Sequence, residues 1–127
     1  MLNTPIITKL FFVAILSGFI TLYIVADETS HATKQQEINK LEKFAYANCL
    51  YGYFKKHKYD SKDILNIAGS FVETGTSSFE VYQDIADYID NFQTSKKTKQ
   101  NIDPDLLKCF YLDEDQELKN IISKAVN

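Results

Sequence analysis

Two cysteines and two histidines supply the thiols and imidazoles of this 127-residue chain. Cys49 and His57 could be a nucleophile and its base, which must lie within hydrogen-bond reach of each other. Eight residues of one helix, however, separate them by about 12 Å along the helix axis. His31 belongs to the N-terminal segment, and a zinc ion would need a fourth ligand and closer ligand spacings. The sequence therefore predicts no enzyme, no metal and no other cofactor.

Acidic side chains recur on one face of a predicted helix near the middle of the chain. Glu80, Asp84 and Asp87 follow i, i+4, i+7 spacing, and Asp90 borders the same face. Paired carboxylates can serve acid–base chemistry, but a stripe opposite an apolar face is usually a solvated surface. A surface that meets a protein partner is the alternative interpretation.

The basic residues exclude one class of partner. All 14 are lysine, and the net charge of the chain is −3. Without arginine, planar two-point contacts to phosphate cannot form, and a net negative charge opposes binding to a polyanion. Nucleic acid is therefore not expected as a partner.

The N-terminus has the composition of an export signal. Lys9 precedes an uncharged apolar run over residues 10–26, which small residues follow. The run predicts a signal peptide within residues 1–32, cleaved after Ala26 or Ala32, and an exported domain over residues 33–127. An uncleaved signal anchor is the alternative, since 17 apolar residues approach the lower limit for spanning a bilayer. Either interpretation places the domain in the periplasm, with membrane contact only through this segment.

Apolar spacing predicts helices over most of the exported part. Ile38, Leu41, Ala45 and Cys49 form one stripe of a long helix over residues 34–58. A second helix is predicted after Asp60 or Ser61 and a third after the segment around residues 75–80.

The junction between the second and third helices has the clearest local signals. Gly75 is predicted to adopt the left-handed conformation that often terminates a helix. Ser77 and Glu80 have the spacing of a capping box for the helix that follows.

Residues 93–102, QTSKKTKQNI, are polar and basic and predict an exposed loop. Asp103 and Pro104 then predict the start of a short helix. Asp113 and Gln116 form a second capping-box pattern before the last helix.

These elements predict an all-α domain, a compact bundle of about five helices. Cys49 and Cys109 both lie in the exported part, where two thiols usually pair. A disulfide between them would close a loop of roughly 60 residues, worth about 4 kcal/mol in the chain-entropy model, and would join the first helix to the fourth. Two buried free thiols are the alternative.

Three short motifs stand out in this helical frame: NCL at 48–50, IAGSFVETGTSSFEVYQDIADYI at 67–89 and DLLKC at 105–109. With the signal segment and the lysine-rich loop, they resemble the type VI secretion amidase immunity proteins over residues 40–122. The resemblance implies an all-helical homodimer that binds a secreted peptidoglycan amidase of the NlpC/P60 type and occludes its Cys–His active site. A helical envelope protein, periplasmic or membrane-anchored and without a toxin partner, is the alternative.

Exposed polar segments are the candidates for effector binding, because loop tips on a rigid scaffold often carry recognition. An ordinary flexible connector and a solvated helix face are the alternatives for the two segments. Tyr53 and Tyr88 lie off the main apolar stripes and are further contact candidates. The predicted binding residues are Ser95, Lys96, Lys97, Thr98, Lys99 and Gln100 in the loop and Glu80, Asp84, Asp87 and Asn91 on the helix face.

Overall fold

The computed structural model describes the backbone from residue 5 to residue 127 and the side chains from residue 30 onward. The predicted signal peptide lies almost wholly outside the described side chains, so it stays a prediction. From residue 30 onward, no helical stretch combines the length and the apolarity needed to cross a bilayer. The chain divides into two compact units, residues 1–35 and residues 36–127.

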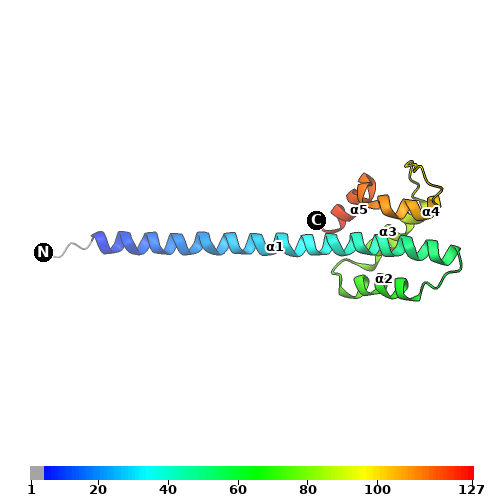
Figure 1. Cartoon of the computed structure of the whole chain (residues 1–127). Helices are drawn as coiled ribbons and strands as arrows, with labels where there is room; N and C mark the ends of the chain where they lie inside the picture. Colours follow the sequence, from blue (N-terminus) through cyan, green and yellow to red (C-terminus); the bar gives the residue numbers. More distant parts are fainter. Residues whose placement is uncertain (1–4) are drawn as a thin grey trace. The chain divides into compact units, whose positions relative to one another are not determined.

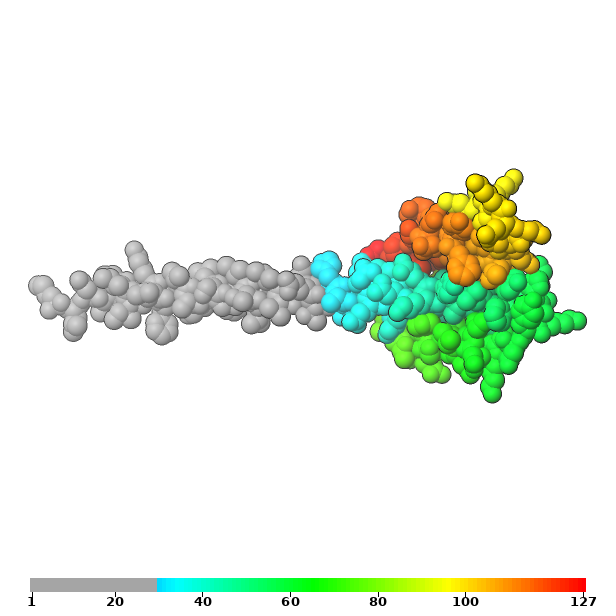
Figure 2. Space-filling view, viewed as in Figure 1, coloured from blue at the N-terminus to red at the C-terminus, as the bar shows by residue number. Residues whose placement is uncertain are grey.

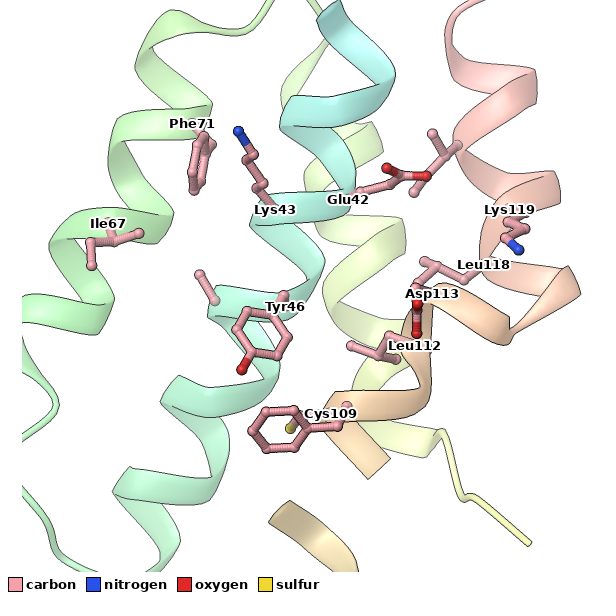
Figure 3. Close-up of a pocket in the computed structure, with 13 residues that line it drawn as sticks. Glu42, Lys43, Tyr46, Ile67, Phe71, Cys109, Leu112, Asp113, Leu118 and Lys119 are labelled. Carbon is pink, nitrogen blue, oxygen red and sulfur yellow. The ribbon is translucent and has the colours of Figure 1, made fainter. Parts of the chain in front are cut away.

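Five α-helices and one 3₁₀ helix make up the described backbone, which contains no strand (Figure 1). The all-α prediction is therefore confirmed. Within residues 36–127, α2 lies on one side of α1 and α5 lies on the other (Figures 1 and 3). The elements are α1 (Pro5–Lys56), α2 (Lys62–Thr74), α3 (Phe79–Asn91), α4 (Pro104–Leu107), the 3₁₀ helix η1 (Lys108–Glu114) and α5 (Gln116–Ala125).

The core forms where the apolar faces of these helices meet. Leu41 of α1, Ile85 and Ile89 of α3 and Ile122 of α5 are almost completely buried, and α3 packs against α5. The spacing of Leu41 with Ile38 and Ala45 predicts the burial of this side chain. Burial of such side chains is the main favourable term in folding, so these contacts hold the bundle together.

The junction between α2 and α3 corrects two predictions. Gly75 is extended, with φ −77° and ψ 166°, and is not left-handed. Glycine is needed here for space, because a Cβ atom would lie 1.8 Å from the Tyr82 hydroxyl oxygen, which donates to the Phe71 carbonyl at 3.2 Å. The N-cap of α3 is Ser78, so the predicted Ser77–Glu80 capping box is wrong.

Ser77 instead bonds to a buried carboxylate of α1. One oxygen of Glu37 accepts from the backbone N–H groups of Thr76 and Ser77, both at 2.9 Å, and from the Ser77 hydroxyl at 2.7 Å. Glu37 is only 5% exposed. Burial would raise the pKa of this carboxyl, but these hydrogen bonds outweigh burial and lower it. The conformation of the junction is thus fixed from α1.

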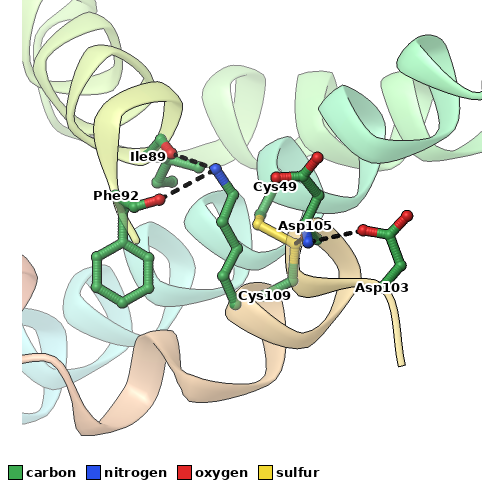
Figure 4. Close-up of a disulfide and its surroundings, with 7 residues drawn as sticks. Cys49, Ile89, Phe92, Asp103, Asp105 and Cys109 are labelled. Carbon is green, nitrogen blue, oxygen red and sulfur yellow. Dashed lines mark hydrogen bonds between the residues drawn. A yellow bond between two sulfur atoms is a disulfide. The ribbon is translucent and has the colours of Figure 1, made fainter. Parts of the chain in front are cut away.

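Cys49 and Cys109 form the predicted disulfide, with their Cα atoms 5.6 Å apart (Figure 4). It joins α1 to η1, so the covalent link between the first helix and the segment after Pro104 is confirmed. Both cysteines are buried among the core side chains.

Of the two helix N-caps predicted after the loop, the first is confirmed and the second is wrong. Asp103 caps α4 and accepts from the Asp105 N–H at 2.8 Å, as predicted. The Asp113–Gln116 capping box is wrong, because η1 continues to Glu114 and Asp115 is the N-cap of α5. Short 3₁₀ helices are common between α-helices. They show no apolar periodicity from which their last residue could be predicted.

Candidate recognition surface

The loop over residues 93–103 emerges from the scaffold between α3 and α4. Its predicted contact residues, 95–100, are all exposed, and Figure 2 shows this yellow segment at the surface of the domain. No residue of this loop belongs to a helix or a strand. Its conformation therefore depends on a small number of side-chain contacts.

Lys96 fastens the middle of the loop to η1. Its ammonium group lies 2.7 Å from the Glu114 carboxylate and 5.2 Å from the centre of the Tyr111 ring. The hydrogen bond to Glu114 raises the pKa of Lys96. Lys96 is thus engaged within the protein, whereas Lys97 and Lys99 are exposed and have no partner among the described residues.

Both ends of the loop are also anchored. Lys108 donates to the carbonyl oxygens of Ile89 and Phe92 at 3.1 and 3.2 Å, where α3 ends. At the other end, the Asp103 carboxylate accepts from the Asp105 N–H at 2.8 Å, and Asp105 pairs with Lys56 of α1. Nε2 of His57 lies 3.2 Å from the Asp103 carboxylate but makes no hydrogen bond to it. A loop held at the start, middle and end presents its free lysines from a defined position.

The acidic face of α3 is exposed as predicted. Glu80, Asp84, Asp87 and Asn91 all face solvent, and the Asn91 amide donates to the Asp87 carbonyl at 2.8 Å. The backbone N–H of Glu80 and the Ser78 hydroxyl lower the pKa of the Glu80 carboxyl. Among the described residues, no hydrogen bond or ion pair joins this acidic face to residues 95–100, so the two predicted segments are separate polar surfaces.

The sequence did not predict an apolar groove on the domain. A cavity of about 450 Å³ lies above α1, with α2 on one side and η1 and α5 on the other (Figure 3). Ile67 and Phe110 remain 51% and 56% exposed at its edges, and the Tyr46 and Phe110 rings meet edge to face at 5.6 Å. One signal is present in the sequence, because Ile67 and Phe71 lie four residues apart on one face of α2 and both line the groove. Exposed apolar clusters of this kind often mark interaction sites.

The tyrosines named as contact candidates also contact other residues of the domain. Tyr53 packs against His57 with the ring centres 4.4 Å apart, and Tyr88 donates to the Asp115 carboxylate at 2.6 Å. Burial, together with this hydrogen bond, raises the pKa of Tyr88. Both side chains are partly exposed, so a contact role for them stays a prediction.

Within the part of the chain that the structure describes, Cys49, Cys109 and His57 do not form a nucleophile–base pair. Both sulfur atoms are held in the disulfide, and the His57 ring packs against the rings of Tyr53 and Tyr59. No three potential metal ligands cluster over residues 30–127. Together, the fold and this surface define a disulfide-linked helical domain with an exposed, anchored loop.

Comparison with known families identifies the class. Residues 39–122 match the Tai4 family, described as the amidase immunity protein of the type VI secretion system. The chain therefore belongs to this family of amidase immunity proteins, as the resemblance implied. No curated protein and no solved structure matches the chain.

Proposed function

We propose that this protein is a periplasmic immunity protein that binds a cognate peptidoglycan amidase and occludes its active site. Membership of the amidase immunity family supports this role. The observation that carries the proposal is the anchored loop, which presents Lys97 and Lys99 to solvent on a disulfide-linked scaffold. Ser95, Thr98 and Gln100 accompany them.

A rigid loop suits inhibition better than a flexible one. Ordering a loop on binding consumes part of the interaction free energy, and a loop that is already ordered avoids that loss. Thr98 contributes to this order, since its hydroxyl donates to the Gln100 carbonyl at 2.7 Å. The acidic face of α3 would add a second contact of opposite sign, which favours one orientation of the partner.

The remaining parts of the proposal follow from the sequence and the family. The N-terminal segment would export the domain to the compartment where the amidase acts. The protein would use no cofactor and catalyse no reaction, and a cell-wall hydrolysis assay of the purified protein tests that statement. Turnover of peptidoglycan by the protein alone would contradict it.

A homodimer, which the family resemblance implies, would need a surface from which apolar side chains leave water. The groove edged by Tyr46, Ile67 and Phe110 is the candidate for that surface. An Ile67→Asp, Phe110→Asp variant should then sediment as a monomer when the wild type sediments as a dimer. Unchanged dimerisation would move the interface elsewhere.

Co-expression tests the central proposal. The full chain is produced together with a periplasm-targeted amidase encoded beside it, and lysis and complex formation are measured. We expect rescue and co-purification, both lost when residues 96–100 are replaced by a Gly-Ser segment. Rescue that survives the replacement would shift the contact to the helix faces, and lysis without a complex would contradict the proposal.

A further inference from the structure

The Cys49–Cys109 disulfide lies close to both ends of the loop over residues 93–103 (Figure 4). Cys109 follows Lys108, whose ammonium group donates to the Ile89 and Phe92 carbonyls at 3.1 and 3.2 Å. These carbonyls end α3 and begin the loop (Figure 4). Since Cys109 is bonded to Cys49, one dipeptide connects α1 to the point where the loop leaves the helix.

The far end of the loop returns to the same part of α1. Lys56 pairs with Asp105, and the His57 ring lies beside the Asp103 carboxylate. The hydrogen bond from Lys56 lowers the pKa of Asp105. Lys56 is the last residue of α1 and lies about two turns after Cys49. The disulfide and the Lys56–Asp105 pair therefore hold the two ends of residues 105–109 against α1.

The other anchors are weak on their own. The Lys56 and Lys96 side chains are 66% and 50% exposed, and exposed ion pairs contribute little because water and salt screen them. The disulfide is the covalent link and is buried. Loss of this link would allow η1 and Lys108 to move away from α1 and from the end of α3.

We infer that the Cys49–Cys109 disulfide, acting through Lys108, positions the loop for effector binding, so that the oxidised protein inhibits and the reduced protein does not. Lys108 is a positioning residue here, because its ammonium group is engaged with the end of α3. This inference rests on the proposed function and adds its regulation. A chain that has not yet been oxidised would present a loosely held loop, which must be ordered at a cost in affinity.

Hydrogen exchange tests the positioning separately from binding. The full-length protein, recovered from the envelope of producing cells, is compared before and after reduction. One dithiothreitol supplies two electrons and two protons, yielding two cysteine thiols and its own cyclic disulfide. The reporters are the Phe92 amide, bonded to the Ile89 carbonyl, and the Leu107 amide, bonded to the Asp103 carbonyl at 2.9 Å. We expect exchange at both to rise roughly tenfold on reduction. Unchanged exchange in protein with two titratable thiols would overturn the inference.

A variant that keeps the disulfide shows whether the loop loosens without general unfolding of the protein. Lys108→Met should raise exchange at Phe92 and weaken amidase binding roughly tenfold, with a cooperative unfolding transition retained. Lys119→Met on α5 is the control and should change neither quantity. Equal behaviour of the two variants would overturn the role of Lys108. If the oxidised wild type binds no amidase, the proposed function fails, while the exchange experiment still decides whether the disulfide positions the loop.

Discussion

At the scale of single residues, Gly75 has the most exacting environment in the domain. A methyl group there would meet the Tyr82 hydroxyl oxygen at 1.8 Å and the Phe71 carbonyl oxygen at 2.9 Å. Overpacking of this kind typically costs about 1–3 kcal/mol. We therefore expect Gly75→Ala to lower the free energy of unfolding by this amount, measured by urea denaturation.

Two further variants make the test of Gly75 specific. Gly52→Ala adds a methyl group in a helix where nothing lies within 4 Å, so it should stabilise the protein by about 0.5–1 kcal/mol. Tyr82→Phe removes the hydroxyl and should recover part of the loss caused by Gly75→Ala. A neutral Gly75→Ala would contradict the packing described for the junction.

Glu37 should make stability depend on pH. Its pKa is lowered in the folded protein, so its stabilising contribution is present above the pKa of the unfolded chain. That contribution is lost as pH falls through the folded pKa. We expect Glu37→Gln to lower the melting temperature near neutral pH and to flatten its decline in acid, measured by thermal unfolding.

Glu42→Gln is the matched control for Glu37, since Glu42 lies on the same helix and is exposed. It should leave the melting curve of the wild type unchanged across the acidic range. Parallel curves for wild type and Glu37→Gln would show that the hydrogen bonds from Thr76 and Ser77 do not stabilise the folded carboxylate.

At the junction between α2 and α3, the sequence predicted which residue matters but not the contacts it makes. Gly75 was identified from the sequence, but the predicted reason was wrong. The left-handed residue among the described ones is Lys58, with φ 59°, where the Tyr59 N–H bonds back to the Phe54 carbonyl at 2.9 Å. Glu37 was missed because its partners lie about 40 residues away in the chain.

At the scale of elements, the lysines of the loop over residues 93–103 differ in their contacts. Lys96 is engaged by Glu114, so Lys97 and Lys99 are left to meet a partner. Lys97→Ser with Lys99→Ser should weaken amidase binding about tenfold, mainly through slower association at low salt. Calorimetry and stopped-flow measurements at two salt concentrations check this, and the melting temperature should not change.

A charge-matched control separates the effect of the loop lysines on amidase binding from the effect of net charge. Lys62→Ser with Lys124→Ser removes the same charge from exposed positions on α2 and α5. This pair should bind the amidase almost as the wild type does. Equal losses for the two double variants would mean that overall charge, and not the loop, determines binding.

Elements were predicted better than their ends. Apolar spacing located the helices because it reflects a long, repeated pattern of burial. Capping residues were less certain, since several Ser and Asp side chains stand within a few positions of each end. Asp113 and Asp115 are an example, and the choice of Asp115 follows from the length of η1. The groove over α1 was not predicted, because it depends on how four separate elements meet.

At the scale of the whole molecule, the disulfide joins two segments that lie far apart in the sequence. Cys49 and Cys109 lie 60 residues apart in the sequence, and cross-links over such lengths typically contribute about 2–5 kcal/mol. Cys49→Ala with Cys109→Ala should lower the urea midpoint accordingly. The comparison is made without reductant, and an unchanged midpoint would contradict the stabilising role of the link.

The central claim is inhibition of an amidase by stoichiometric binding, and a titration tests it most directly. A candidate amidase, sought among the products of neighbouring genes, is incubated with peptidoglycan fragments while the immunity protein is added in increasing amounts. We predict that hydrolysis falls linearly to zero near one binding site per amidase. The variant with a Gly-Ser segment over residues 96–100 should require a large excess. Full hydrolysis in the presence of excess wild-type protein would contradict the account.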